Sequence, residues 1–125
     1  MADLTTYGPY SPVCKAGNLL LVSGQVGVDP ITKEASTDIV AQTEQALHNM
    51  EDVLRSVEAT LQDVVKTTIF LTDMNDFAAM NSVYEKVFSA PRPARSTVSV
   101  RELPRVGGTT PIRIEIEAVA YKELS

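Results

Sequence analysis

Two stretches near the end of the chain decide which fold this sequence can adopt: PRPARSTVSV at residues 91–100 and IRIEIEAVAY at residues 112–121. The prolines end the preceding helix, because proline lacks a backbone N–H and pushes the residue before it out of the helical region. Beyond them, hydrophobic and polar side chains alternate, as they do along a half-buried strand. We therefore predict strands at residues 95–100 and 112–121.

Side-chain parity in these two strands predicts a polar pair on one face of the sheet. In the first strand Val98 and Val100 share one face, and Arg95 lies on the other. In the last strand the residues that share a face are Ile112, Ile114, Ile116, Ala118 and Ala120. If both hydrophobic faces lie on the core, Arg95 and Glu117 project from the same non-core face. They could then hold and attack a small anionic molecule, although most such faces are merely solvated. The two residues could also form a structural ion pair that braces a subunit interface.

Length, composition and charge limit the classes of function. The 125 residues predict one domain, residues 1–125, and the 44% hydrophobic and 22% charged content is ordinary for a soluble globular protein. A formal net charge of −5 argues against nucleic acid, whose phosphates need basic patches. No hydrophobic run reaches the roughly 18 residues of a membrane span, and no secretory signal is visible at the start. We expect neither a nucleic-acid nor a membrane partner.

The chain contains one cysteine and one histidine. Cys14 excludes an internal disulfide, which fits the reducing cytoplasm. It could be a nucleophile, but no strong activating group is adjacent, so we interpret it as a small hydrophobic packing residue. His48 lies among charged residues of a predicted helix, and we expect it at the surface. One cysteine and one histidine are too few ligands for a zinc site of the Cys/His type, so we predict none.

The remaining pattern gives the order of the elements. Turn signals fill residues 1–17, and residues 18–28 and Val64–Leu71 are predicted strands. Residues 38–57 and 75–88 have the three-to-four-residue hydrophobic spacing of helices. The result is an α+β domain in which two helices cover one face of a mixed sheet. Because the predicted strands carry hydrophobic residues on both faces, we expect a second copy of the chain to cover the other face.

Two further features are less decisive. Asn81 lies beside the hydrophobic stripe of the second predicted helix, four residues after Phe77 and three before Tyr84. A buried asparagine must find hydrogen-bond partners, so Asn81 is either a structural brace or a site residue. The two glycines of residues 107–111 lack the spacing of a phosphate-binding loop and a following helix, so we interpret this segment as a flexible loop.

Short motifs that occur in order along the whole chain carry a resemblance to a known family. They are GPYS at 8–11, VSGQ at 22–25, VVKTT at 64–68, FLTDMNDF at 70–77, PARS at 93–96 and IEIEA at 114–118. Together they resemble the RidA/YjgF family of reactive-intermediate deaminases. The resemblance implies a chorismate-mutase-like fold and a homotrimer with three active sites in the clefts between subunits.

The resemblance also implies an activity, the hydrolysis of 2-imino acids such as 2-iminobutanoate and 2-iminopropanoate to 2-oxo acids and ammonia, without a metal or cofactor. The substrate-binding arginine of the family falls on Arg95, and the carboxylate of its last motif on Glu117. Arg95 suits a substrate carboxylate because its planar fork makes two parallel hydrogen bonds. Glu117 suits a general base that holds and deprotonates water. The cleft residues of the family fall on Tyr10, Ser23 and Asn81.

The sequence departs from the family pattern at three places. Thr97 stands where many members have a cysteine, so thiol chemistry is excluded there. The resemblance implies that the backbone at this position contacts substrate, so the threonine need not abolish activity. Pro12 replaces the commoner glutamine, and the loop at 107–111 is longer than in short members. Two other functions stay open. One is a 2-oxo acid sensor or chaperone-like holdase without turnover, and the other is a hydrolase of the same fold that acts on another enamine or an amide.

Overall fold

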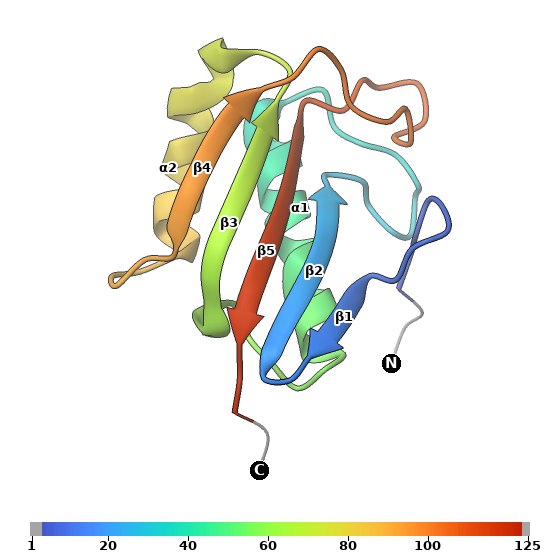
Figure 1. Cartoon of the computed structure of the whole chain (residues 1–125). Helices are drawn as coiled ribbons and strands as arrows, with labels where there is room; N and C mark the ends of the chain where they lie inside the picture. The colour runs from blue at the N-terminus through green and yellow to red at the C-terminus, as the bar shows by residue number, and fades with distance from the viewer. Residues whose placement is uncertain (1–3, 124–125) are drawn as a thin grey trace.

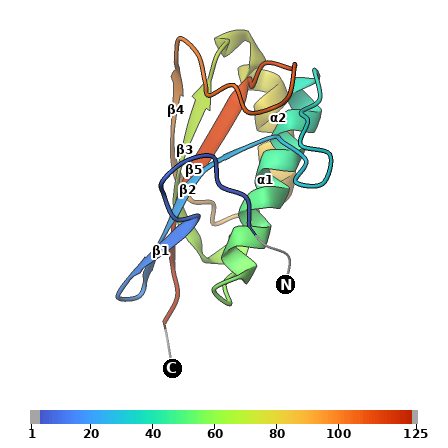
Figure 2. The same cartoon turned by 90° about the vertical axis from the view of Figure 1, so that its right-hand side faces the viewer.

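The structure is a computed structural model that describes residues 4–123. In this part of the chain a five-stranded sheet carries two α-helices on one face (Figure 1, Figure 2). The described residues place no helix on the other face, which we call the open face. The strands are β1 (Val13–Ala16), β2 (Leu19–Val26), β3 (Val64–Leu71), β4 (Ala94–Ser99) and β5 (Ile114–Tyr121), and the helices are α1 (Ile39–Arg55) and α2 (Phe77–Val87). The predicted α+β class, with both helices on one face of a mixed sheet, is confirmed.

The strand order β1-β2-β5-β3-β4 places the last strand of the chain in the centre of the sheet. β5 pairs antiparallel with β2 and β3, and β1 pairs antiparallel with β2. β3 and β4 are parallel, so the chain must cross over between them, and α2 makes this crossover. β4 consequently lies at an edge, and one of its sides is unpaired among the described residues.

α1 follows the hydrophobic stripe predicted for residues 38–57. The Asp38 carboxylate caps its start by accepting a hydrogen bond from the Ala41 amide at 3.2 Å. The buried residues of the helix are Ile39, Gln42, Thr43, Ala46, Leu47, Met50, Val53 and Leu54. They form one core with the helix-facing side chains of β2, β3 and β5. The helix ends at Arg55, two residues earlier than predicted, and the chain then turns through Glu58, whose φ is +62°.

α2 begins two residues later than the predicted segment 75–88. The Asp73 carboxylate accepts a hydrogen bond from the Asn75 amide at 2.9 Å, and this holds Met74–Asp76 in a separate 3₁₀ turn, η2. At the other end Phe88 is already extended. Within residues 4–123 neither helix has the length and hydrophobicity needed to cross a membrane.

The N-terminal region contains a strand where the sequence predicts only turns. β1 forms a hairpin with β2, and Gly17, with a φ of +61°, lies in the turn between them. Cys14 lies on this outer strand and is exposed, so it does not pack in the core as expected. His48 is at the surface, as predicted, with 59% of its side chain accessible.

The first C-terminal strand begins at Ala94, one residue earlier than predicted, and faces the opposite way, whereas the second is shorter than predicted. β4 ends at Ser99, and β5 begins at Ile114 rather than at residue 112. In the parallel ladder Thr67 pairs with Arg95, and Ile69 pairs with Thr97. Thr67 and Ile69 are fully buried on the helix side, so Arg95 and Thr97 also face the helices.

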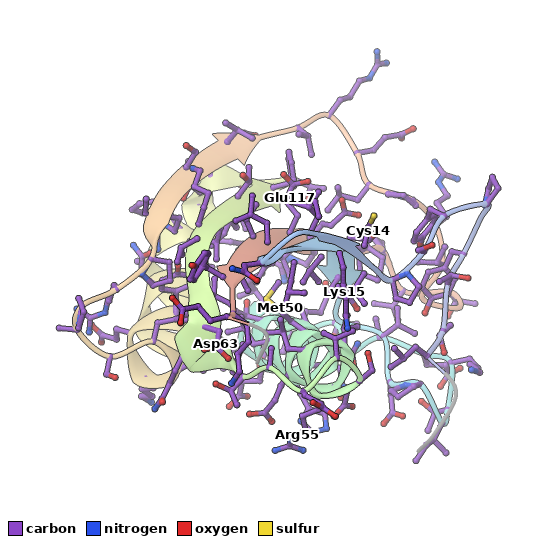
Figure 3. The ribbon with its side chains drawn as sticks, turned by 60° about the horizontal axis from the view of Figure 1, so that its bottom comes forward. Cys14, Lys15, Met50, Arg55, Asp63 and Glu117 are labelled. Carbon is purple, nitrogen blue, oxygen red and sulfur yellow. The ribbon has the colours of Figure 1, made fainter. Side chains whose placement is uncertain are left out.

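Glu117 faces the other way. It pairs with Thr68 of β3, between the buried residues Ile116 and Ala118. Figure 3 shows Glu117 on the side of the sheet away from α1, whereas Met50 lies between the sheet and α1. The prediction that Arg95 and Glu117 share one face is therefore wrong. The alternation of side chains along an edge strand determines which residues share a face, but not which of the two faces meets the core. In β4 the face that carries Arg95 and Thr97 meets the core.

Candidate functional site

The first group of polar residues lies between β4 and α2, and we call it the arginine cluster: Arg95, Thr97, Asn81, Phe77 and Tyr84. The guanidinium carbon of Arg95 lies 4.8 Å from the ring centroid of Tyr84 and 5.6 Å from that of Phe77. Both distances are within the range of cation–π attraction. Among residues 4–123 the guanidinium has no hydrogen-bond or ion-pair partner. An arginine held only by rings keeps all its donors available for an anion.

Two oxygen atoms of the arginine cluster also lack partners. The Asn81 Oδ1 and the Thr97 Oγ1 are buried, and neither has a hydrogen-bond partner within the described chain. Asn81 lies on α2 between the two rings that contact Arg95, and Thr97 lies two residues beyond Arg95 on β4. Buried polar atoms normally find partners, so exceptions point to an absent ligand or water. The cluster thus combines an unpaired cation with two unpaired oxygens.

The second group lies on the open face where β2 meets β5, and we call it the carboxylate cluster: Glu115, Glu117, Ser23 and Gly24. A bulge interrupts the β2–β5 ladder between Val22 and Gln25. Bulges re-aim side chains and are common beside active sites. The Ser23 amide donates to the Pro12 carbonyl at 3.0 Å, and its hydroxyl donates to the Ser11 carbonyl at 2.6 Å. The bulge therefore holds the N-terminal segment against β2.

Gly24 makes room for the carboxylate of Glu115. A Cβ added to Gly24 would overlap the Cγ, the Cδ and the Oε2 of Glu115. These are all side-chain atoms, so a larger residue fits at position 24 only if the Glu115 side chain moves. Tyr10 lies in the N-terminal segment and lines a pocket together with Gly24. Its hydroxyl accepts a hydrogen bond from the Tyr7 amide at 3.1 Å, which leaves its own proton to donate.

Glu115 has the electrostatic properties expected of a proton acceptor. Burial raises the pKa of Glu115 above its ordinary value, and the negative charge of Glu117 raises it further. Among the described residues the Glu115 carboxylate has no hydrogen-bond or ion-pair partner. Sequence reasoning selected Glu117 and missed Glu115, because the two alternate identically in IEIEA. The signal was Gly24, which only the pairing of β2 with β5 places beside Glu115.

A pocket of ≈ 330 Å³ opens beside the carboxylate cluster, between the N-terminal segment and α1. Tyr10 and Gly24 contribute to one wall, and Asn49 and Val53 of α1 to the other. Arg95 does not line it. Within residues 4–123 no three His, Cys, Asp or Glu side chains come together as metal ligands would.

The structure does not bring the two clusters together in one chain. β5 and β3 lie between β2 and β4, so Ser23 and Arg95 are separated by three strand spacings, about 14 Å. They also lie on opposite faces of the sheet. A molecule of a few carbon atoms cannot contact both. The predicted site residues therefore divide into Arg95, Thr97 and Asn81 in one place, and Ser23 and Glu117 in another. Tyr10 lines the pocket between the N-terminal segment and α1.

The open face carries hydrophobic side chains that one chain leaves uncovered. Leu19 pairs with Tyr121 across β2 and β5, and the two are 41% and 45% exposed. Leu21 on the same face of β2 is 42% exposed, and so is Val98 of the edge strand β4. Exposed hydrophobic groups of this size commonly mark a protein interface.

Comparison with known proteins places this architecture in a family. A family model described as endoribonuclease L-PSP matches residues 1–122. A RutC family protein of Pyrococcus horikoshii is 48% identical over 117 residues, which cover 93% of this chain and 89% of the relative. A protein of Escherichia coli named 2-iminobutanoate/2-iminopropanoate deaminase is 41% identical over 118 residues, covering 92% and 88%. The crystal structure of RidA from an Antarctic Psychrobacter superposes with a TM-score of 0.88 at 38% identity, covering 94% of this chain and 92% of the other.

Proposed function

Because this chain belongs to the RidA/YjgF family, we propose that it hydrolyses reactive 2-imino acids, such as 2-iminobutanoate and 2-iminopropanoate, to 2-oxo acids and ammonia. The observation that carries the proposal is the arginine cluster. Its guanidinium has no anionic partner within the described chain, and the unpaired oxygens of Asn81 and Thr97 lie beside it. The relative from Escherichia coli whose name gives this activity supports the assignment.

The arginine cluster suits the binding of a 2-imino acid. The Arg95 fork matches the substrate carboxylate through two parallel hydrogen bonds, each worth about 1.5–3 kcal/mol net. The Asn81 Oδ1 can accept a hydrogen bond from the imine N–H, and the Thr97 hydroxyl can donate one to the carboxylate. The rings of Phe77 and Tyr84 exclude water from one side of the guanidinium, which strengthens its attraction for an anion.

The carboxylate cluster suits the activation of water. A carboxylate with a raised pKa accepts a proton more readily at neutral pH, and we propose that Glu115 is this base, with Glu117 as the second candidate. The water oxygen adds to the imine carbon, and its proton passes to the carboxylate. The resulting carboxylic acid returns this proton to the nitrogen, and the hydroxyl proton of the tetrahedral adduct then passes through the carboxylate to the same nitrogen as the C–N bond breaks. Ammonia leaves with both protons of the water, and the carbonyl of the 2-oxo acid remains. We propose that Ser23 supplies a hydroxyl group beside this water and that the Tyr10 hydroxyl reaches it from the N-terminal segment.

We also propose that the active site forms between copies of the chain, in a homotrimer. The arginine cluster and the carboxylate cluster cannot reach one small substrate within one chain, so a neighbour must supply one of them. The unpaired edge of β4 and the exposed hydrophobic residues of the open face support such an assembly. The substrate is then the small-molecule partner, and a net charge of −5 argues against nucleic acid.

A second function is favoured by the separation of the clusters. The arginine cluster alone contains no base, so a chain that fails to assemble productively would bind 2-oxo acids without turnover. A hydrolase of another enamine or of an amide would use the same residues with a different substrate. Measured 2-oxobutanoate binding without hydrolysis of any imine would favour the sensor function.

The experiment that tests the proposal generates the imine in the cuvette. An amino-acid oxidase with catalase converts 2-aminobutanoate to 2-iminobutanoate, and semicarbazide traps the imine that survives. The protein should decrease the trapped fraction in proportion to its concentration, and Arg95→Ala should not. Arg105→Ala, at an arginine that is 88% exposed, is the matched control and should act like the wild type. An unchanged trapped fraction with the wild-type protein would contradict the proposal.

A further inference from the structure

The position of the Arg95 guanidinium depends on the position of α2. Within the described chain no hydrogen bond or ion pair fixes the guanidinium, and the contacts that orient it are the rings of Phe77 and Tyr84, at 5.6 and 4.8 Å. Both rings belong to α2. A displacement of this helix along the sheet would therefore move the group that binds the substrate.

Two side-chain contacts tie α2 to the sheet, one near each end of the helix. Near the C-terminal end, the Tyr84 hydroxyl and the Thr67 hydroxyl of β3 are 2.8 Å apart and buried. At the N-terminal end, Asp76 directly precedes the helix, and its Oδ1 accepts a hydrogen bond from the Nη2 of Arg113 at 2.7 Å. The two contacts lie on either side of the segment that carries Phe77 and Asn81, so together they fix its position along the sheet.

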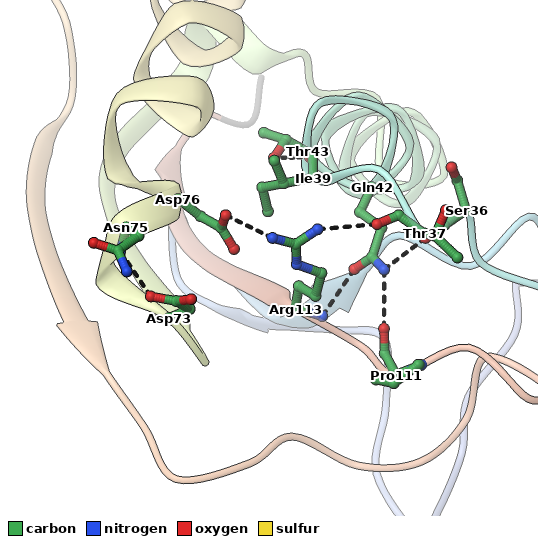
Figure 4. Close-up of polar contacts among 10 residues, drawn as sticks. All are labelled: Ser36, Thr37, Ile39, Gln42, Thr43, Asp73, Asn75, Asp76, Pro111 and Arg113. Atoms are coloured by element: carbon green, nitrogen blue, oxygen red, sulfur yellow. Dashed lines mark hydrogen bonds and ion pairs between the residues drawn. The ribbon is translucent and has the colours of Figure 1, made fainter.

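Arg113 is itself held by the start of α1, as Figure 4 shows. Its Nη1 donates to the Thr37 carbonyl at 2.9 Å, and its backbone amide donates to the Gln42 Oε1 at 2.8 Å. Gln42 is fully buried, and its Nε2 donates to the carbonyls of Ser36 at 2.7 Å and Pro111 at 3.0 Å. Arg113 thus connects the rigid start of α1 and of β5 to the first residue before α2.

The Asp76 carboxylate depends on this one connection. Only 9% of its side chain is exposed, its Oδ2 is buried without a partner in the described chain, and its Oδ1 is bonded to Arg113. Asp76 does not cap α2 with its own side chain. A buried carboxylate that loses its cation must move toward water, because an unpaired buried charge is strongly unfavourable. The start of α2 would move with it.

We propose that Arg113 and Asp76 are positioning residues for Arg95. The pair fixes the start of α2, α2 places the rings of Phe77 and Tyr84, and these rings direct the guanidinium toward the substrate carboxylate. The catalytic consequence rests on the proposed imine hydrolysis, but the structural consequence does not. The pair touches no reacting atom, so its loss affects substrate binding rather than the chemical step.

The test uses two variants in the full chain. Arg113→Lys keeps the charge but cannot bridge Thr37 and Asp76, and Asp76→Asn keeps the shape without leaving a buried charge. Each should raise the KM for 2-iminobutanoate by about threefold to thirtyfold, the usual range for residues that act at a distance, with kcat within about twofold. Val22→Ala, a core substitution on β2, is the control for destabilisation alone. It should lower the melting temperature and leave KM unchanged.

A measurement that needs no activity completes the test. The Arg95 Nε proton lies beside two aromatic rings, whose ring currents shift its NMR resonance. That resonance is assigned by its absence in Arg95→Lys and calibrated with Phe77→Leu. It should move toward the Phe77→Leu value in Arg113→Lys and Asp76→Asn, but not in Val22→Ala.

An unchanged Arg95 resonance in the folded variants would overturn the proposal. Failure of both variants to fold would also overturn it, because the pair would then serve folding alone. If the resonance moves but the wild-type protein hydrolyses no imine, the positioning role stands and the proposed function fails. The two proposals can therefore be separated.

Discussion

The arginine cluster and the carboxylate cluster are built in different ways. In the arginine cluster a helix packs against an edge strand, and two aromatic rings hold a cation that no described polar group contacts. In the carboxylate cluster a bulge and a glycine hold a carboxylate against the backbone of a neighbouring strand. The first is suited to binding an anion and the second to taking a proton. Because they lie on opposite faces, their separate roles can be tested separately.

The largest effect is expected from Arg95→Ala. Loss of two charge-assisted hydrogen bonds, at about 1.5–3 kcal/mol each, predicts a decrease of about 10²–10⁴-fold in kcat/KM. The affinity for 2-oxobutanoate, measured by titration calorimetry, should fall in parallel. The melting temperature should decrease only modestly, because Arg95 loses its contacts with two rings but no ion pair within the described chain. A folded variant that keeps the wild-type affinity would show that the arginine cluster does not bind the substrate.

The carboxylate cluster is tested by two matched variants. Glu115→Gln keeps the shape of the side chain but accepts no proton at neutral pH, so kcat should fall by about 10²–10⁴-fold, the usual effect of losing a general base. Binding of 2-oxobutanoate should persist, in contrast to Arg95→Ala. Glu117→Gln should decrease kcat less, because Glu117 lies nearer solvent. A larger decrease of kcat in Glu117→Gln than in Glu115→Gln would instead identify Glu117 as the base.

The sequence predicted the elements of the fold better than it predicted how the site is assembled. Hydrophobic spacing identified both helices and the central strands to within two residues, because the buried faces of these elements are long and regular. The face of β4 could not be predicted, since the polar residues Arg95 and Thr97 face the helices while the hydrophobic Val98 stays exposed. Glu115 could not be distinguished from Glu117 without knowing that Gly24, within the bulge, lies beside the Glu115 side chain.

Mixing the two inactive variants tests whether the clusters act across subunits. Equal amounts of Arg95→Ala and Glu115→Gln are unfolded together and refolded, so that the chains exchange at random. If each site takes its arginine from one chain and its carboxylate from the neighbour, about one site in four has both, and about a quarter of wild-type activity should return. The variants mixed without unfolding are the control. If both clusters act within one chain, refolding will restore no activity.

The smallest effect concerns pH and distinguishes the two carboxylates by charge alone. Burial, and then the charge of Glu117, raise the pKa of Glu115 above its ordinary value of 4.5. A base is inactive when protonated, so activity should fall as pH decreases through this raised pKa. Glu117→Gln removes the nearby negative charge, lowers the pKa of Glu115 and should move the acid limb of kcat toward lower pH. If the acid limb of the kcat–pH profile is at the same pH in Glu117→Gln as in the wild type, Glu115 is not the group whose protonation stops the reaction.

The same raised pKa has a consequence for stability that needs no assay of activity. When the pKa of a carboxyl is higher in the folded chain than in the unfolded chain, its contribution to stability is fully present below the unfolded pKa. This contribution is lost as pH rises through the folded pKa.

Ionised Glu115 is thus unfavourable for folding at neutral pH, and Glu115→Gln removes that effect. The melting temperature of Glu115→Gln relative to wild type should therefore increase from pH 4 to pH 7, an interval that spans the ordinary value of 4.5. Scanning calorimetry measures this difference directly. A constant difference across the interval would mean that Glu115 titrates like an exposed carboxyl, and the carboxylate cluster would then lack the property that distinguishes its base.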